Sequence, residues 1–416
     1  MDLRCQIQKA LERAETLGGK EGLNCIAELD GTALEQVKSL TRQAFEEKHP
    51  AFGMPVLIKD NIDVKGLHTT AGSLALADNV AKEDAPVVKN LRRNGVIILG
   101  KTNMTEFANY TAQGMPNGYS SLGGQVVHCA NPSLDPSGSS SGSGVAVAAG
   151  IVPAAVGTDT SFSIIACAQA NGICGIKPPV GVLPAEGIIP IARTLDSAGV
   201  LARNMTDALK LYSAMRDGRL PILESVPVDE LRIAVNTANR GNVSEGQTAF
   251  LNKLLSLLPP IKEIEQKPTM WQKVIMQWEF RPHLEDYLRT SSATYKTLQE
   301  IVACYETHPD TMMKYGIFYL KQALDETPGG LCGAPYLEAM MNRQEMIRQI
   351  KTQIKPFDAV LMTGPTNVMH FCGLPSVTVA GRQTNEYGVR RCVILYGADE
   401  YRLYRAALTI ERLLNE

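Results

Sequence analysis

A stretch of small residues at positions 136–178 constrains the fold more than any other part of this sequence. It reads PSGSSSGSGVAVAAGIVPAAVGTDTSFSIIACAQANGICGIKP. A serine and glycine cluster at 137–143 precedes an apolar run at 145–156 and a second segment, 157–163, that ends on a serine. A Ser/Gly run by itself is typical of a flexible linker, whereas the apolar run beside it favours a buried, ordered segment. Because glycine and serine let backbone and hydroxyl groups approach a ligand closely, we expect an ordered site here.

Composition and charge argue against several classes of protein. Of the 416 residues 44% are hydrophobic, enough for a large core, and the length allows two or three domains or one large α/β domain with insertions. The 41 basic and 43 acidic residues leave a net charge of −2, so there is no electrostatic case for nucleic acid or for an anionic membrane. Nine cysteines without a CxxC pair indicate reduced thiols rather than disulfides. Six histidines show no metal-ligand spacing, so we expect neither a metal nor another cofactor.

The N-terminal segment indicates a protein without a secretory leader. Residues 2–16 combine charged and apolar side chains at helical spacing and contain no apolar signal-sequence core. No apolar run approaches the roughly 18 residues that a membrane-spanning helix requires. We therefore expect a cytoplasmic protein.

The order of the predicted elements indicates an α/β fold with a largely parallel or mixed sheet. Apolar strands alternate with amphipathic helices, and loops rich in Gly, Pro, Asn and Ser, such as 113–125, connect them. The predicted strands are 55–58, 95–99, 154–156, 172–177, 187–191, 231–235, 357–362, 373–380 and 389–396. The predicted helices are 2–16, 32–48, 85–94, 142–150, 204–216 and 400–414, with another that starts at 104–110.

The composition changes in the second half of the chain. Residues 243–350 are rich in Glu, Gln, Lys, Met and aromatic residues and follow a helical period, which indicates a helical insertion or lid. Trp271 and Trp278 are spaced so that one helix face can bury both; core packing is the ordinary interpretation and substrate contact the alternative. The predicted parts of one compact domain are the N-terminal part of the core at 1–235, a mostly helical insertion or lid at 236–352, and a return to the core sheet at 353–416.

The choice of base limits the chemistry that the serines can perform. A serine nucleophile needs a base, and histidine is the usual one, but no histidine of this chain stands in such a motif. Residues 100–102 read GKT, yet the upstream glycine of a phosphate-binding loop is missing, so we reject a nucleotide site. The remaining option is a serine–lysine system, which needs a lysine that is partly neutral at the working pH. Lys59, after the strand 55–58, is the candidate, although a lysine there is ordinarily a solvated surface residue.

Four motifs in a fixed order resemble the signature of a known family, the amidase signature family of serine hydrolases. They are GMPVLIKDNIDVKG at 53–66, LGKTNMTEFAN at 99–109, GSSSGSGVAVAAG at 138–150 and GTDTSFSI at 157–164. The similarity is dense over 26–216 and looser over 355–414, and the helical segment between them carries no recognisable motif. The resemblance implies a large mixed central sheet covered by helices on both faces.

The resemblance also implies a Ser–cis-Ser–Lys triad that hydrolyses amides. By the matching motifs, Lys59 is the base, Ser139 is the bridging serine that follows a cis peptide bond, and Ser163 is the nucleophile that forms an acyl-enzyme. Hydrolysis of a carboxamide would then release ammonia or an amine. Backbone N–H groups form the oxyanion hole in this interpretation, and they belong to Thr160, Ser161, Phe162 and Ser163.

Within the family, the resemblance is closest to the peptide amidase branch. It indicates the substrate-binding residues less clearly than the catalytic residues. Tyr119, in the loop 113–125, is a candidate for the pocket wall, with an ordinary surface loop as the alternative, and Gly138 and Phe162 are the other candidates. The chain departs from the family at Phe162, where the family has glycine, and at Cys167, where it has proline. If the backbone needs glycine there, Phe162 strains the oxyanion hole, and its ring narrows the acyl pocket.

Two alternatives to a working amidase stay open. The first is the A subunit of a glutamine-dependent amidotransferase, which requires a partner protein and glutaminase activity. The second is a catalytically impaired family member that acts as a binding protein, which the departure at Phe162 motivates. As partners we expect a small amide or peptide amide and neither nucleic acid nor a membrane, while a homodimer stays open.

Overall fold

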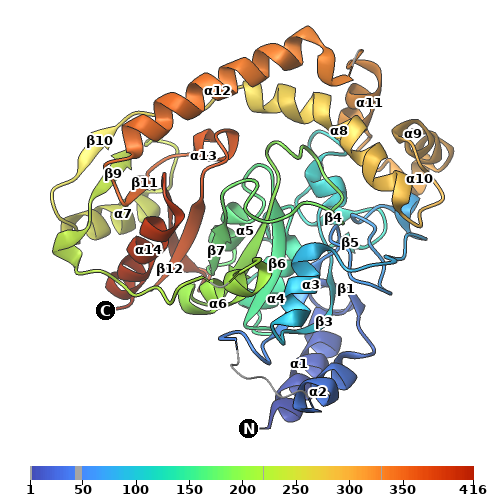
Figure 1. Cartoon of the computed structure of the whole chain (residues 1–416), viewed down its shortest axis with the longest axis horizontal. Helices are drawn as coiled ribbons and strands as arrows, with labels where there is room; N and C mark the ends of the chain where they lie inside the picture. The colour runs from blue at the N-terminus through green and yellow to red at the C-terminus, as the bar shows by residue number, and fades with distance from the viewer. Residues whose placement is uncertain (1, 43–48, 219, 329) are drawn as a thin grey trace.

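An eleven-stranded mixed sheet runs through the centre of the molecule (Figure 1). The structure is a computed structural model that describes residues 2–42, 49–218, 220–328 and 330–416. The strand order is β1-β3-β2-β6-β8-β7-β12-β13-β11-β9-β10. Parallel pairing joins β3-β2-β6 and β11-β9-β10, and the other neighbours pair antiparallel. The predicted α/β class and its large mixed sheet are therefore confirmed.

The elements have the following bounds. The sheet strands are β1 (Ile26–Leu29), β2 (Pro55–Lys59), β3 (Ile97–Thr102), β6 (Ala154–Asp159), β7 (Cys174–Lys177), β8 (Ser197–Ala202), β9 (Ile233–Asn236), β10 (Lys262–Ile264), β11 (Ala359–Met362), β12 (Ser376–Thr384) and β13 (Arg390–Tyr396). A separate hairpin consists of β4 (Tyr119–Ser120) and β5 (Gly124–Gln125). The helices are α1 (Leu3–Gly18), α2 (Ala33–Arg42), α3 (Pro86–Arg93), α4 (Ser141–Ala148), α5 (Ile165–Ala170), α6 (Met205–Met215), α7 (Glu245–Leu257), α8 (Trp271–Thr290), α9 (Leu298–Thr307), α10 (Pro309–Met312), α11 (Phe318–Asp325), α12 (Ala334–Ile354), α13 (Val368–Phe371) and α14 (Glu400–Asn415). The end of the predicted helix 32–48, at 43–48, lies outside the described residues.

Helices cover both faces of the sheet, because the side chains of each strand alternate between the faces. In β2, Leu57 packs into the core on one face, and Val56 and Ile58 pack into the core on the other. Buried residues of α1, α4, α5 and α8 belong to the first core, and those of α3, α6, α7 and α14 belong to the second. Each buried Val, Leu or Ile stabilises the fold by about 1.5–3 kcal/mol. The two cores thereby fix the ends of β2 and β6, where the candidate site lies.

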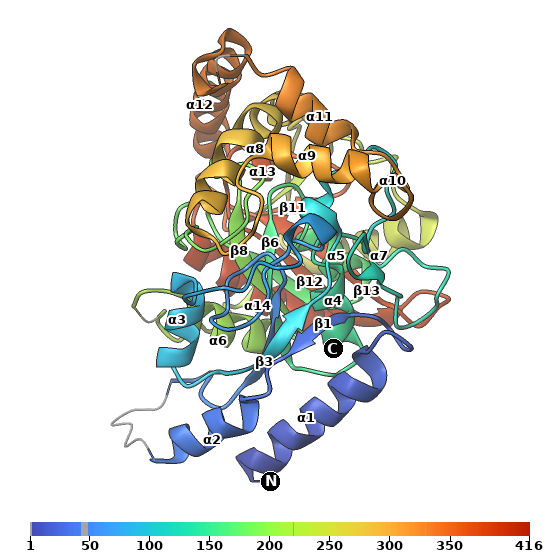
Figure 2. The ribbon, with the colours of Figure 1, turned by 90° about the vertical axis from the view of Figure 1, so that its right-hand side faces the viewer.

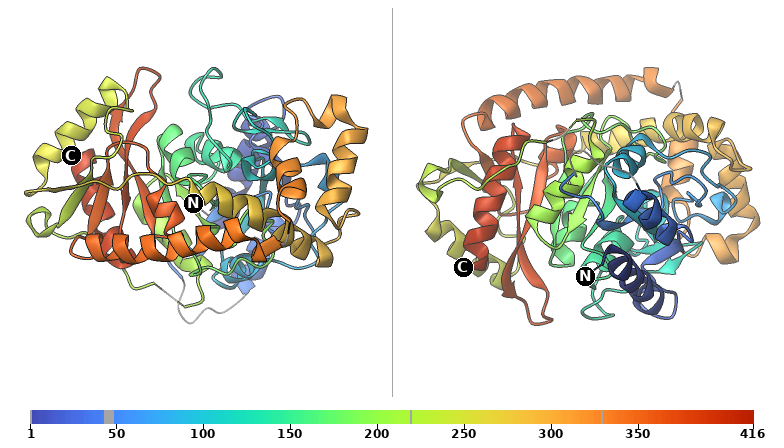
Figure 3. Two further views of the ribbon diagram at one scale, coloured as in Figure 1. Left: turned by 90° about the horizontal axis from the view of Figure 1, so that it is seen from above. Right: turned by 60° about the horizontal axis from the view of Figure 1, so that its bottom comes forward.

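Most of the predicted helical segment, α8 to α12, forms a layer on the side of the first core, whereas α7 packs in the second core. In Figure 1, α12 arches across the top of the molecule and α8 to α11 lie beside it, and Figure 2 shows these helices at the end remote from α1 and α2. Figure 3 shows α12 along the outside of the molecule. Trp278 is buried in the first core and Trp271 packs against that core, which confirms the packing interpretation. β10 interrupts the helices and pairs with β9, and the three-part division of the chain stays a prediction.

Residues 187–191, predicted as a strand, form an irregular loop instead. In the described chain their ladder contact is a single bridge from Ile188 to Ile62, and Pro190 has no N–H to donate to a ladder. The strand that follows them, β8, was not predicted, because its residues SAGVLA are mostly small and have low strand propensity. No helix within the described residues is long and apolar enough to cross a membrane.

Two segments near the candidate site also differ from what the sequence indicates. The polar residues 100–103 read as a turn, but 100–102 continue β3, and the side chain of Lys101 is buried. The helix predicted to start at 104–110 is a short 3-10 turn, Glu106–Asn109, because residues 107–109 adopt positive φ angles that an α-helix cannot contain.

Candidate active site

Lys59 lies at the carboxyl end of β2, and its side chain is fully buried. Its Nζ atom lies 2.7 Å from Ser139 Oγ, 3.0 Å from Ser140 Oγ and 2.8 Å from Thr158 Oγ1. Burial lowers the pKa of Lys59 from 10.5 to about 7, although nearby acidic groups oppose the shift. A lysine with this pKa is partly neutral at neutral pH, which is the condition that a serine–lysine system requires.

Ser139 connects Lys59 to Ser163. Ser139 Oγ and Ser163 Oγ are hydrogen-bonded at 3.0 Å, although the two residues are 24 positions apart in the sequence. The Gly138–Ser139 peptide bond is cis, as the resemblance implied. Ser139 is fully buried, and Ser163 is 6% exposed. The three predicted residues thus form one hydrogen-bonded path from a buried amine to a serine at the border of the core.

The first serine loop, residues 135–141, leads into α4 and carries Ser139. The carbonyl of Ser139 accepts a hydrogen bond of 3.1 Å from the N–H of Thr105, which ties the loop to the end of β3. Gly138 is half-buried, and a Cβ atom there would lie 2.5 Å from Thr105 Oγ1. The position therefore has no room for a side chain, and its predicted contact with substrate stays a prediction.

The second serine loop, residues 159–165, joins β6 to α5 and carries Ser163. Asp159 Oδ2 accepts hydrogen bonds from the N–H groups of Ile164 at 2.8 Å and Ile165 at 3.2 Å. These bonds fix the start of α5 directly after the serine. Within the part of the chain that the structure describes, four successive backbone N–H groups donate to no protein acceptor: those of Thr160, Ser161, Phe162 and Ser163.

Phe162 has the left-handed backbone that glycine favours. Its φ angle is 72°, and a side chain in this region costs about 1–2 kcal/mol. The departure from the family's glycine is therefore accommodated without a change to a right-handed backbone. Its ring packs against the ring of His370, with 4.2 Å between the centroids and 31° between the planes. The first core is thereby extended up to the second serine loop.

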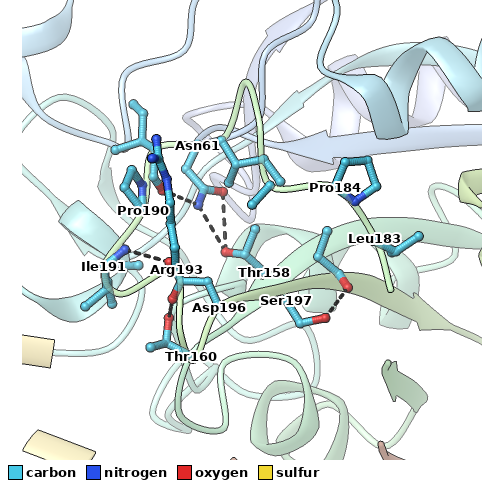
Figure 4. Close-up of a pocket in the computed structure, with 15 residues that line it drawn as sticks. Asn61, Thr158, Thr160, Leu183, Pro184, Pro190, Ile191, Arg193, Asp196 and Ser197 are labelled. Atoms are coloured by element: carbon cyan, nitrogen blue, oxygen red, sulfur yellow. Dashed lines mark hydrogen bonds between the residues drawn. The ribbon is translucent and has the colours of Figure 1, made fainter. Parts of the chain in front are cut away.

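Two residues from distant segments hold Thr160. Its Oγ1 donates to Asp196 Oδ1 at 2.5 Å, as Figure 4 shows, and its carbonyl accepts from Gln272 Nε2 of α8 at 3.0 Å. Asp196 Oδ2 also accepts from the N–H groups of Ile191 and Ala192, both at 3.0 Å. Burial raises the pKa of Asp196 from 3.8 to about 7, against the opposing effect of these hydrogen bonds.

A pocket lies beside these residues, lined by polar groups and by apolar side chains of the segment 183–191 (Figure 4). Asn61, Thr158 and Asp196 belong to its lining. Asn61 Nδ2 donates to Thr158 Oγ1 at 3.1 Å, and the same oxygen accepts from Lys59. One hydroxyl group therefore links the pocket lining to the buried amine.

His370 of α13 lies next to the second serine loop and was not selected by sequence reasoning. It is fully buried, and its Nε2 atom lies 3.1 Å from Asp159 Oδ1. Burial lowers the pKa of His370 from 6.5 to about 4, although Asp159 opposes the shift, so the ring is neutral at neutral pH. No local motif marks this histidine, because its partners, Asp159 and Phe162, belong to a distant segment.

The last predicted substrate-binding residue, Tyr119, and the lysine of the GKT sequence lie away from the serine–lysine path. Tyr119 is half-buried in β4, with its ring 4.9 Å from that of Tyr315 in an edge-on arrangement, and its part in a pocket wall stays a prediction. Lys101 Nζ donates to the carbonyl of His68 at 2.7 Å and lies 3.7 Å from Asp60. These contacts compensate the burial of its amine. Among the described residues, no group of three or more His, Cys, Asp or Glu could hold a metal ion.

A family model and several curated proteins resemble this chain in sequence over its first half. The model of the amidase family matches residues 6–243. A probable amidase of Arabidopsis thaliana is 41% identical over 200 residues, which are 48% of this chain and 37% of that protein. A glutamyl-tRNA(Gln) amidotransferase subunit from Exiguobacterium sibiricum is 39% identical over 209 residues, 50% of this chain and 42% of that protein. The matched regions thus span less than half the length of these relatives.

Solved structures resemble the whole chain. An amidase family protein from Bacillus anthracis superposes with a TM-score of 0.90 at 26% identity and covers 100% of this chain and 88% of that one. The peptide amidase from Stenotrophomonas maltophilia superposes with a TM-score of 0.87 at 27% identity and covers 100% of this chain and 94% of that one. The similarity of structure therefore includes the helical segment, for which the sequence offered no motif.

Proposed function

This chain belongs to the amidase family, and we propose that it hydrolyses the C–N bond of a carboxamide with Ser163 as its nucleophile. The observation that carries the proposal is the hydrogen-bonded path from Lys59 Nζ through Ser139 Oγ to Ser163 Oγ, with distances of 2.7 and 3.0 Å. A hydroxyl group is a weak nucleophile unless a base accepts its proton. Here the base is an amine whose pKa burial brings to about 7.

Two hydroxyl groups orient the amine of Lys59. Ser140 Oγ donates its own proton to the carbonyl of Thr158 at 3.1 Å and accepts from the N–H of Thr158 at 3.4 Å, which leaves a lone pair to accept from Lys59. Thr158 Oγ1 accepts from Lys59 at 2.8 Å in the same way. A neutral amine has two N–H groups and one lone pair. With the N–H groups directed at these two oxygens, the lone pair is left for the proton of Ser139.

The proposed reaction moves one proton along this path and back. Ser163 Oγ attacks the amide carbonyl carbon while its proton passes to Ser139 Oγ and the proton of Ser139 passes to Lys59 Nζ. The C–N bond of the tetrahedral intermediate then breaks, and the leaving nitrogen takes a proton returned through Ser139, which releases ammonia or an amine. Water attacks the acyl-enzyme by the same relay and regenerates Ser163.

Backbone amides are available for the oxyanion. The unpaired N–H groups of residues 160–163 lie at or next to the proposed nucleophile, and loss of one such donor costs about 2.7–4 kcal/mol in transition-state stabilisation elsewhere. Thr160, the fourth predicted member, is fixed through its side chain and carbonyl. Because Ser163 is only 6% exposed and the Phe162 ring lies beside it, a small acyl group or a terminal carboxamide fits this site best.

One assay tests the proposal against both alternatives. Ammonia release is measured from small carboxamides, peptide amides and free glutamine, with wild-type protein and with Ser163→Ala. Release from carboxamides that vanishes in Ser163→Ala supports the proposal, whereas undiminished release in that variant overturns it. Release from glutamine alone would favour the amidotransferase alternative, which the relative from Exiguobacterium motivates. No release from any substrate, with no fluorophosphonate labelling of Ser163, would leave a binding protein as the function.

A further inference from the structure

We propose that His370 is a positioning residue that holds Phe162 in its left-handed conformation and thereby keeps the second serine loop ready for the oxyanion. The proposal rests on the proposed function for its catalytic consequence and on the contacts of this chain for its geometry. His370 touches neither Ser163 nor Lys59 in the proposed mechanism, so it acts through Phe162 and Asp159.

The first step is the backbone of Phe162. With φ at 72°, it occupies a region that residues with a side chain rarely adopt. The N–H of Phe162 is also one of the four unpaired N–H groups, between those of Ser161 and Ser163. A return of Phe162 to a right-handed backbone would turn these peptide groups. Whatever holds Phe162 therefore also holds the direction of the proposed oxyanion donors.

The second step is the contact that holds it. The Phe162 and His370 rings lie 4.2 Å apart between centroids at an interplanar angle of 31°, so the two ring faces are in close van der Waals contact. Within the described chain the backbone of Phe162 makes a single hydrogen bond, from the N–H of Ala166 to its carbonyl, at 2.8 Å. The N–H of Phe162 thus has no protein acceptor, so Phe162 is held by the hydrogen bond to its carbonyl and by the contact of its ring with His370.

The third step is the fixed position of His370 itself. It is fully buried in α13, and its Nε2 lies 3.1 Å from Asp159 Oδ1, while the other carboxylate oxygen binds the N–H groups of Ile164 and Ile165. Asp159 therefore lies against His370 and also binds the start of α5, directly after the second serine loop. Neither ring nitrogen of His370 has a well-formed hydrogen bond among the described residues, so its place is set by packing.

A double-mutant cycle tests this role. We expect His370→Ala to lower kcat by about tenfold or more and to change KM by less than about twofold, because the donors act on the transition state. In the Phe162→Gly protein, where glycine adopts the left-handed backbone without support, the same His370→Ala change should lower kcat by less than about threefold. His370→Phe, which keeps a ring for stacking, should recover kcat to within about threefold of wild type. An equal loss in both backgrounds, or no recovery with phenylalanine, overturns the proposal.

Thermal unfolding of the same proteins separates this proposal from the proposed function. The two substitutions should be less than additive in their effect on Tm, and His370→Leu serves as the second variant if His370→Ala does not fold. If wild-type protein releases no ammonia, the proposed function fails, and the unfolding cycle still decides whether His370 supports Phe162. Additive effects on Tm would overturn the positioning role, whatever the activity.

Discussion

The two serine loops hold their serines in different ways. In the first loop the left-handed residue is Ser137, with φ of 59°; its N–H donates to Asp135 Oδ1 at 2.7 Å, and its carbonyl accepts from Ser141 Oγ at 2.6 Å. In the second loop the left-handed residue is Phe162, whose carbonyl accepts from the N–H of Ala166 and whose ring packs on His370. Local hydrogen bonds support both strained residues, and the second one, Phe162, also has an aromatic contact from a distant segment.

The difference shows which parts of the chain each serine depends on. Ser139 is set by a local turn, by the start of α4 and by the end of β3. Ser163 is set by groups that arrive from three later segments, through Asp196, Gln272 and His370. Substitutions far from the site should therefore disturb the second loop more than the first, and the following experiments measure this.

The largest expected effect is the loss of either relay serine. Ser163→Ala should lower turnover by about 10⁴-fold or more, because no other group can form the acyl-enzyme, and Ser139→Ala should have an effect of similar order, because the proton path is cut. Both variants should fold, since each loses a single hydroxyl group. Ser133→Ala, an exposed serine ahead of the first loop, is the matched control and should keep full activity. Turnover is measured by ammonia release, and retained activity in Ser139→Ala would remove the first loop from the chemistry.

The next effect is the dependence of activity on pH. Burial lowers the pKa of Lys59 to about 7, and the amine is the active form, so kcat/KM should rise with pH through about 7 and reach a plateau above it. Below the pKa the rate should fall about tenfold per pH unit. Burial also raises the pKa of Asp196 to about 7, so its carboxylate becomes protonated as the pH falls through the same range. The hydrogen bond between Asp196 and Thr160 of the second loop then loses its charged acceptor. The profile is recorded between pH 5 and 9.

Asp196→Asn separates the two groups in that profile. The variant removes the second titration and leaves Lys59 in place. If Lys59 sets the profile, the variant keeps the rise near pH 7, at a lower plateau. A profile that becomes flat in Asp196→Asn would assign the pH dependence to the second loop instead of the lysine.

The proposed relay followed from the resemblance, because the motifs that carry Lys59, Ser139 and Ser163 match the family's signature. Lys59 follows an apolar strand, and Ser139 and Ser163 end or open runs of small residues that only a tight backbone uses. The cis peptide bond before Ser139 followed from the same resemblance. The α/β class was predictable from the residues themselves, since strands such as β2 and helices such as α6 have clear periodicity.

The supports of the second loop were not predictable, because they depend on contacts between distant segments. His370 and Gln272 are single polar residues in apolar surroundings, and nothing nearby in sequence distinguishes them from ordinary buried residues. β8 was not predicted because its neighbours in the sheet, and not its own strand propensity, require its small residues. At Gly199, for example, a Cβ atom would lie 2.3 Å from the carbonyl oxygen of Ile176. Tertiary packing overrides local propensity at such positions.

A smaller effect is expected from Gln272, which ties α8 to the second loop. Gln272→Leu leaves the buried carbonyl of Thr160 without its 3.0 Å hydrogen bond, which should lower the free energy of unfolding by about 1–3 kcal/mol. Turnover should fall by about threefold to tenfold, since the loop loses one of its fixed points. Gln349→Leu, at an exposed glutamine of α12, is the control and should change neither quantity. Denaturant unfolding and ammonia release check both. An unchanged stability in Gln272→Leu would mean that α8 does not support the loop.

The smallest effect separates the two left-handed residues directly. Ser137→Gly relieves the strain of a side chain at positive φ but adds freedom to the unfolded chain, so the free energy of unfolding should stay within about 0.5 kcal/mol of wild type. Phe162→Gly gains the same relief and also loses the contact with His370, so it should be less stable than Ser137→Gly by about 1 kcal/mol. Denaturant unfolding of both variants measures the difference. If Phe162→Gly were the more stable of the two, the ring would not be the support of the second loop, and the contrast between the loops would disappear.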